Sequence, residues 1–283
     1  MKKGSFISLI LLLININPAW AIDIKISDTR ENNFYIDALT FILDKSGKDY
    51  KITSVNLPTS SQQRKVLLIK KRVIDLMYAG TSIALEKELR PIRFPVMRGL
   101  AGRRIFLINK NYQAEYASIK NLNDLKQYTG VQGIGWSDKQ VLEASGLKQV
   151  AKLYDDIFGN LNAGSRYYFP RGMTEIFAEL ENKKPKMENL IIEKSILLEY
   201  KTAVFFFVNP SNIALANTLN TGFINAYKEG SYNHFFYTHP LIIDSFKQAK
   251  LKTRKKIIVR NPFLSHETSD IPKQYWHQDN DSY

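Results

Sequence analysis

The stretch SRYYFPRGMTEIFAELE, residues 165–181, carries the most distinctive site chemistry in the chain. Its apolar residues recur at helical spacing and are Met173, Ile176, Phe177 and Leu180. Pro170 suits a first helical position, which would place Arg171 at the positive end of the helix dipole at a cost of up to about 1 kcal/mol. We expect an offsetting partner, which is either Glu175 or an anionic ligand. In the ligand alternative, Arg171 holds an acidic group and Tyr168 lines a cleft.

A second candidate is the stretch GWSDKQ, residues 135–140. Ser137 and Gln140 have the spacing of a capping box, and Trp136 and Val141 have that of a hydrophobic staple. These residues either only start a helix, or they also bind a ligand. In the second case Trp136 stacks on the ligand, while Ser137 and the helix N-terminus offer N–H groups to an anion.

Three further hydroxyl-bearing residues and one arginine follow predicted strands. Arg30 comes after the first strand, and Tyr78, Thr81 and Ser82 come after the third. As ligand-binding residues they would line one edge of a parallel sheet. The alternatives are a solvated loop arginine and ordinary turn chemistry.

Catalytic and metal-binding patterns are absent from the sequence. The four histidines all lie in the last fifth of the chain, and there is no H-E-x-x-H, G-x-S-x-G or phosphate-loop motif. Asp155 and Asp156 are adjacent carboxylates, which we expect in a solvated turn. We therefore expect no enzyme activity, no catalytic residue, no metal and no cofactor.

The elements that would position these residues alternate between strand and helix. The first block reads strand, helix, strand, helix, strand over residues 22–26, 34–46, 50–55, 60–71 and 73–77. A second block begins at the strand 105–108 and ends at the apolar strand 202–208, and a long helix follows. Such alternation predicts an α/β protein with two lobes, each a mostly parallel sheet flanked by helices. Lobe one would hold residues 22–104 and 209–283, and lobe two residues 105–208.

The first 21 residues have the features of a secretory signal peptide. Lys2 and Lys3 precede a short apolar run, and Ala19-Trp20-Ala21 resembles a cleavage site. Removing them would lower the net charge from +13 to +11. This charge suits an anionic ligand or surface, but an exported chain rarely meets nucleic acid. We expect a periplasmic protein that does not bind nucleic acid, and the absence of cysteine leaves it to be stabilised by its core alone.

Several motifs resemble periplasmic solute-binding proteins of family 3, which have the type II periplasmic binding protein fold, and in particular a gamma-proteobacterial subgroup. These motifs are PIRFPVMRGLAGRRIFLI, GIGWSDKQVLEASGL, YYFPRGMTEIFAEL, TAVFFFVNPSNIALANTLNTGF and RKKIIVRNPFLS. The resemblance covers nearly all of the chain after residue 21. It departs from the amino-acid binders of the class at Leu85, where these carry an arginine that pairs with the ligand carboxylate. Arg90, Arg93 or Arg98 could take its place.

The resemblance implies a monomer whose two lobes close around a small polar ligand. We expect this ligand to be anionic and to be presented to an ABC permease. The alternative is a periplasmic sensor or interaction protein of the same fold, without a transport substrate, whose partner would be a membrane sensor.

Overall fold

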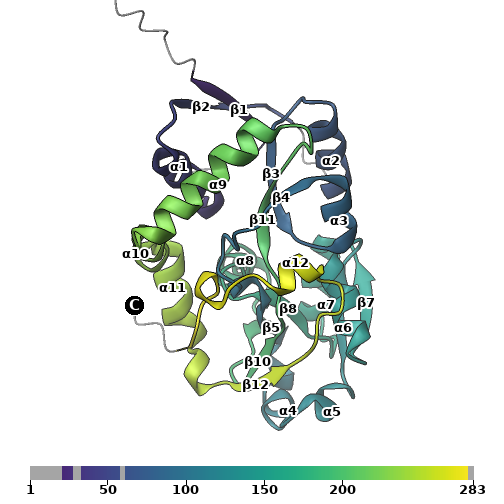
Figure 1. Ribbon diagram of the computed structural model, residues 1–283. Helices are drawn as coiled ribbons and strands as arrows, with labels where there is room; N and C mark the ends of the chain where they lie inside the picture. Colours follow the sequence, from purple (N-terminus) through teal and green to yellow (C-terminus); the bar gives the residue numbers. More distant parts are fainter. Residues whose placement is uncertain (1–20, 28–32, 58–60, 280–283) are drawn as a thin grey trace, which may run out of the picture.

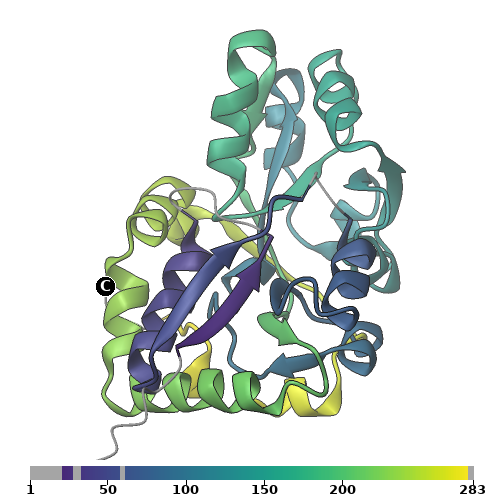
Figure 2. The same cartoon turned by 90° about the horizontal axis from the view of Figure 1, so that it is seen from above.

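The chain folds into two α/β lobes joined by a hinge (Figures 1 and 2). The computed structural model describes residues 21–27, 33–57 and 61–279. Arg30 and the expected signal peptide up to Trp20 lie outside the described residues. Within the described part of the chain, no helix combines the length and the apolar character that a membrane span needs.

Lobe one is built on the strands β1 (Ile22–Ile26), β2 (Tyr50–Ser54), β3 (Leu76–Gly80), β4 (Arg90–Ile92) and β11 (Val204–Val208). β1 and β2 pair in parallel, and β11 lies between β3 and β4, antiparallel to both. The helices of this lobe are α1 (Phe34–Ser46), α2 (Gln62–Lys70), α3 (Ile83–Glu88), α9 (Ile213–Lys228), α10 (Ser231–Thr238), α11 (Pro240–Ala249) and α12 (His266–Ser269).

The first helix forms where the sequence predicts it. The Asn33 side chain caps its start by accepting a hydrogen bond from the Tyr35 N–H, and Gly47 ends it with φ +68°. α1 packs on α9, and the two lie side by side in Figure 1. Their contact depends on Gly222, because a Cβ atom there would lie 2.0 Å from the Ile42 carbonyl oxygen.

Lobe two contains the strands β5 (Arg103–Asn109), β6 (Thr129–Gly133), β7 (Lys148–Lys152), β8 (Phe169–Gly172), β9 (Leu190–Ile192), β10 (Ile196–Glu199) and β12 (Lys255–Ile258). β5 pairs with β8, β9 and β10, all antiparallel, whereas β6 and β7 are parallel. Its helices are α4 (Gln113–Ala117), α5 (Leu122–Leu125), α6 (Ser137–Ala144), α7 (Tyr154–Asn162) and α8 (Ile176–Lys183). Asp155 and Asp156, expected in a turn, lie in the first turn of α7.

Two strands lie in a different lobe from the one that their position in the sequence suggested. Residues 204–208 were expected in lobe two, but β11 completes the sheet of lobe one. Residues 255–258 were expected in lobe one, but β12 pairs in parallel with β10 of lobe two. The chain therefore crosses to lobe two a second time after α11, and it returns to lobe one at α12 (Figure 1).

Candidate functional site

The interlobe cleft is a cavity of about 510 Å³ that elements from both lobes enclose. Lobe one contributes Ser61, Gln62, Gln63, Gly80 and Val204, and the hinge contributes Ala101 and Thr202. Lobe two contributes Arg104, Ile134, Gly135, Trp136, Ser137, Asp138, Arg171 and Glu175. Its volume lies within the range usual for small-molecule sites.

Arg171 lines this cleft, but not at the start of a helix as expected. The segment FPRG forms strand β8, in which Arg171 lies opposite Ile105 of β5, and helix α8 begins only after Glu175. Pro170 is therefore a strand residue, and the predicted unfavourable charge at a helix start does not arise. Pairing with the long hinge strand β5 prevails here over the local helical pattern.

The Arg171 guanidinium is held by two carboxylates. Its Nη2 lies 2.8 Å from Glu175 and 2.7 Å from Glu179, and its Nε donates to Glu179 at 2.8 Å. Burial disfavours the charge, but Glu175 and Glu179 outweigh this and raise the pKa of Arg171. An incoming acidic group would therefore compete with two carboxylates that are already bound.

Trp136 and Ser137 also line the cleft. The Arg171 guanidinium stands over the Trp136 ring at 4.6 Å, so an internal cation–π contact replaces the expected stacking on a ligand at this side of the ring. The expected capping box does not form, because the extended N-cap residue of α6 is Trp136 and no side chain caps the helix. Ser137 instead begins α6 at the wall of the cleft.

A second arginine of the cleft, Arg104, was not predicted. Its Nη2 lies 2.9 Å from Asp138, and its guanidinium stands 5.6 Å from the centre of the Tyr200 ring. The Tyr200 hydroxyl donates a short hydrogen bond to the same Asp138 oxygen. Burial opposes the charge of Arg104, while the Asp138 carboxylate and Tyr200 raise its pKa.

Tyr168 does not line the cleft, contrary to the expectation. Its ring is fully buried in the core of lobe two beside Phe106, and its hydroxyl accepts a hydrogen bond from Gln149 at 3.1 Å. Tyr168 precedes β8, and its backbone bridges to Gly130 of β6.

Tyr78 lies within strand β3, whereas the sequence predicted it to follow the third strand. Its ring stacks on Tyr35 at 4.1 Å, and its hydroxyl accepts a hydrogen bond from the Asn33 amide. Burial, followed by the charges of Glu175 and Tyr78, raises the pKa of Tyr35. Tyr78 is absent from the lining of the cleft, although Gly80 of the same strand is present.

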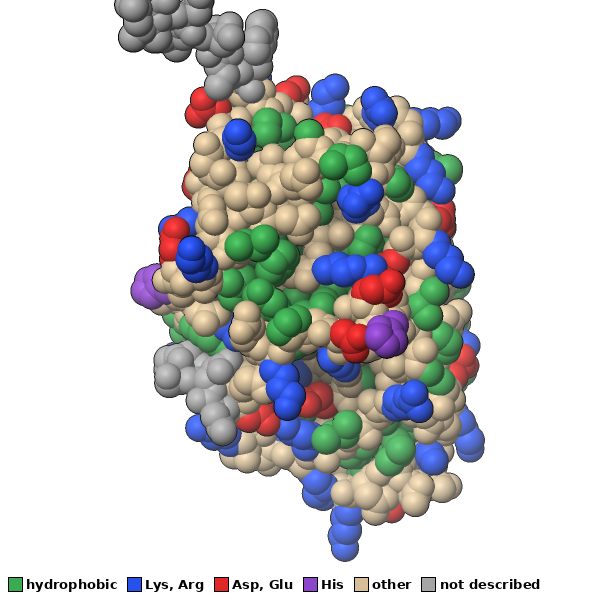
Figure 3. Space-filling model, viewed as in Figure 1, with side chains coloured by type: hydrophobic (Ala, Val, Ile, Leu, Met, Phe, Trp, Pro, Cys, Tyr) green, Lys and Arg blue, Asp and Glu red, His purple; other side chains and the backbone are tan. Residues whose placement is uncertain are grey.

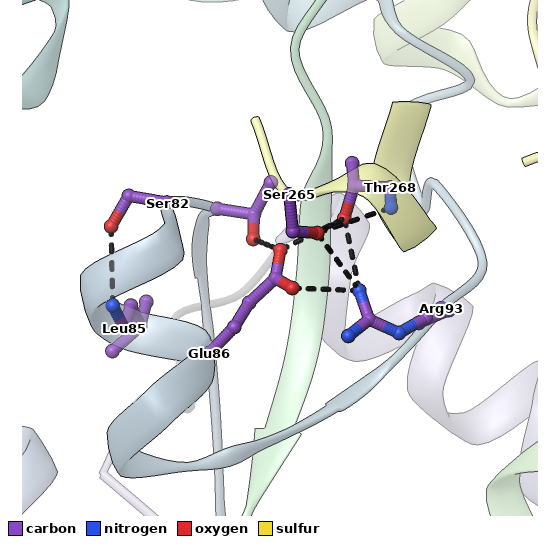
Figure 4. Close-up of polar contacts among 7 residues, drawn as sticks. Ser82, Leu85, Glu86, Arg93, Ser265 and Thr268 are labelled. Carbon is purple, nitrogen blue, oxygen red and sulfur yellow. Dashed lines mark hydrogen bonds and ion pairs between the residues drawn. The ribbon is translucent and has the colours of Figure 1, made fainter. Parts of the chain in front are cut away.

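Thr81 and Ser82 serve structural roles. The Thr81 hydroxyl donates to Glu86 at 2.5 Å, and the Ser82 side chain caps α3 by accepting from the Leu85 N–H. Glu86 also accepts from Arg93 at 2.7 Å and from Thr268 of α12 at 2.8 Å (Figure 4). This network fastens the C-terminal segment to lobe one.

The arginines expected to compensate for Leu85 lie away from the cleft. Leu85 itself is buried in the core of lobe one. Arg93 binds Glu86, Arg90 donates to the Pro210 carbonyl, and Arg98 is buried against Asn233. Arg104 and Arg171 are instead the guanidinium groups of the cleft.

No protein-family model and no curated protein matches the chain. Among solved structures, it is similar to an ancestral arginine-binding protein bound to arginine, with 16% identity, 77% of this chain and 98% of the other covered, and a TM-score of 0.52. It is also similar to an amino-acid ABC transporter substrate-binding protein from Streptococcus pneumoniae bound to L-arginine, with 14% identity, 77% of this chain and 93% of the other covered, and a TM-score of 0.51. A protein from a study of glutathione import in Streptococcus mutans is 10% identical, with 77% of this chain and 95% of the other covered and a TM-score of 0.53.

These similarities define the class of fold. The chain has the type II periplasmic binding protein fold, in which two α/β lobes flank a hinge, as the sequence predicted. Two of these similar structures contain bound arginine.

Proposed function

We propose that this protein is an exported, periplasmic solute-binding protein that closes its lobes around a small polar ligand and presents it to an ABC permease. The observation that carries the proposal is the cleft of about 510 Å³, whose walls come from both lobes and which holds two buried guanidinium groups. Closure would bring the neutral side chains of Ser61, Gln62 and Gln63 toward the charged wall of lobe two.

The charges of the cleft favour a zwitterionic ligand over the simple anion that the sequence suggested. The lining contains Arg104 and Arg171 but also Asp138 and Glu175, so its formal charges balance. A ligand acid can displace Glu175 from Arg171, and a ligand ammonium group can then pair with the released carboxylate. Arginine and glutamine, which are bound by the ancestral protein of the same fold, carry both groups.

A thermal-shift screen on purified residues 22–283 tests the proposal. The panel holds amino acids, short peptides, dicarboxylates, sugars, phosphates and polyamines. A ligand at about 100 times its dissociation constant stabilises the folded protein by roughly 2.7 kcal/mol, which raises the melting temperature by several degrees. A panel without any stabilising compound would contradict transport and would favour the sensor or interaction alternative. That outcome would fit a cleft whose arginines are already satisfied by internal carboxylates.

The substitution Glu175→Gln tests the charge argument, because the Glu175 side chain is 44% exposed and its loss leaves Glu179 on Arg171. We expect zwitterionic ligands to bind at least about tenfold more weakly and simple dicarboxylates to bind more tightly, as measured by calorimetry. Glu188→Gln, an exposed position in the same lobe, is the matched control and should change neither affinity. Tighter binding of the zwitterion to Glu175→Gln would refute the proposed ammonium contact.

A further inference from the structure

A second cavity, of about 480 Å³, lies between the hinge and the C-terminal segment, and we name it the hinge pocket. Arg103, Tyr200 and Lys201 form its hinge wall, Ile258 to Asn261 form a second wall after β12, and Lys273 and Trp276 close it. Arg103 faces this pocket, whereas the next residue, Arg104, faces the interlobe cleft. Because successive side chains of a strand point to opposite faces, β5 separates the two cavities.

The hinge pocket differs from the cleft in its charge. Its lining includes five basic residues, Arg98, Arg103, Lys201, Arg260 and Lys273, and a single carboxylate, Glu199. Asp279 adds one more negative charge beside Arg103 and Lys256. Figure 3 shows basic side chains spread over the face that the C-terminal segment crosses. The surplus of positive charge favours an anion here, in contrast to the balanced charges of the cleft.

Three of the five basic groups are already paired within the protein, which leaves the other two for a ligand. Arg98 donates to Asn233 and to the Gln274 carbonyl, and Arg103 lies 3.4 Å from Glu199. The ammonium group of Lys201 donates to the Ser269 carbonyl.

Arg260 and Lys273 are exposed, and their side chains make no hydrogen bond or ion pair with the described residues. Arg260 follows the strand β12 of lobe two, and Lys273 lies in the segment that returns to lobe one.

Beside polar residues such as Thr202, Asn261 and Ser269, the hinge pocket has an apolar part. Tyr200, Val259, Leu264 and Trp276 line it, together with Ile258, which is 68% exposed. The Trp276 ring is fixed in place, since it packs against Gly99 and its N–H donates to the Ile271 carbonyl at 3.1 Å. A ligand here would need an apolar body to cover these side chains.

We propose that the hinge pocket binds a small amphipathic anion, whose acidic group contacts Arg260 and Lys273 and whose apolar body packs against Trp276, Leu264 and Ile258. Such a molecule is held by both lobes at the hinge. This site lies on the other face of β5 from the cleft, with Thr202 common to both linings, and its occupancy does not depend on the function proposed for the cleft.

Isothermal titration calorimetry with naphthalene-1-sulfonate tests the proposal. Sulfate, which lacks an apolar body, and naphthalene-1-methanol, which lacks a charge, serve as comparison probes. We expect one sulfonate to bind per chain, and both comparison probes to bind at least about tenfold more weakly. No detectable binding of the sulfonate at millimolar concentration would overturn the proposal, as would equal affinity for all three probes.

The double variant Arg260→Gln/Lys273→Gln locates the site. We expect it to weaken sulfonate binding at least about tenfold with an unchanged melting temperature, because both side chains are exposed. Lys148→Gln/Lys186→Gln removes the same charge from exposed positions elsewhere in lobe two and should keep the wild-type affinity. Equal weakening in both double variants would show a bulk charge effect and refute the site. Glu175→Gln, which alters only the cleft, should leave sulfonate binding unchanged.

Discussion

At the scale of single residues, Glu86 is the charged group that links the C-terminal segment to lobe one. Its side chain is only 5% exposed and accepts hydrogen bonds from Arg93, Thr81 and Thr268. Burial alone would raise the pKa of Glu86, but its hydrogen bonds lower it below the usual 4.5. The carboxylate therefore stabilises the fold above the pKa of the unfolded state, and this contribution is lost as the pH falls through the folded-state pKa.

We expect Glu86→Gln to lower the free energy of unfolding by about 1–3 kcal/mol at pH 7, because an amide replaces a carboxylate among three donors. The difference from the wild type should shrink as the pH falls below about 4.5, because the carboxyl group then takes up a proton in the unfolded chain more readily than in the folded protein, where its pKa is lowered. Urea denaturation at pH 7 and at pH 3.5 measures both effects. Glu88→Gln in the same helix removes an exposed pair with Lys70 and should cost less than about 1 kcal/mol at either pH. A constant difference across this pH range would contradict the assignment.

The cleft residues differ in how far the sequence could identify them. Trp136, Ser137 and Arg171 were predicted because they stand in distinctive local patterns. Arg104 follows another arginine, Arg103, and nothing local in the sequence distinguishes the two. They line different cavities because successive side chains of strand β5 point to opposite faces. Asp138 follows Ser137 and reads as an ordinary acidic residue in the first turn of a helix. Its role depends on Tyr200, which is 62 residues away in the sequence.

At the scale of elements, the packing of α1 against α9 depends on Gly222. We expect Gly222→Ala to lower the free energy of unfolding by about 1–3 kcal/mol, because the added Cβ must separate the two backbones. The thermal melting temperature measures this loss. Thr221→Ala changes the exposed neighbouring position of α9 and should have little effect. A stabilised Gly222→Ala variant, as the better helix propensity of alanine alone would give, would contradict the packing argument.

The sequence predicted the strand and helix order of lobe one well, since the signals there are local. Asn33 and Gly47 delimit α1, and the alternating residues of β1 identify a half-buried strand. The prediction from sequence was wrong at β8. The residues after Arg171 have helical spacing, and the predicted helix was started too early, at Pro170, which lies in the strand. β4 and β10 were also missed. Both are short, and their partners, β11 and β5, are distant in the sequence.

At the scale of the whole molecule, the proposed function requires a change in the distance between the lobes. Leu67 on α2 and Leu153 before α7 are 56% and 63% exposed and lie in different lobes. The chain contains no cysteine, so spin labels can be attached at Leu67→Cys and Leu153→Cys alone. We expect the measured label distance to shorten when a stabilising ligand from the screen is added. A label pair at Leu67→Cys and Ile224→Cys, both in lobe one, should keep its distance. Two unchanged distances would refute closure.

The return of the chain to lobe two at β12 also has a consequence for folding. β10 pairs with β5 on one side and with β12 on the other. Ile196 of β10 pairs with Lys255, which is synthesised much later. Until the last thirty or so residues are available, one side of β10 is an unpaired strand edge, which favours association with other chains. Lobe one likewise needs β11 and α9, which follow the whole of lobe two. Neither lobe is built from a single continuous piece of chain, so we expect slow folding that is completed only after β12 has been synthesised.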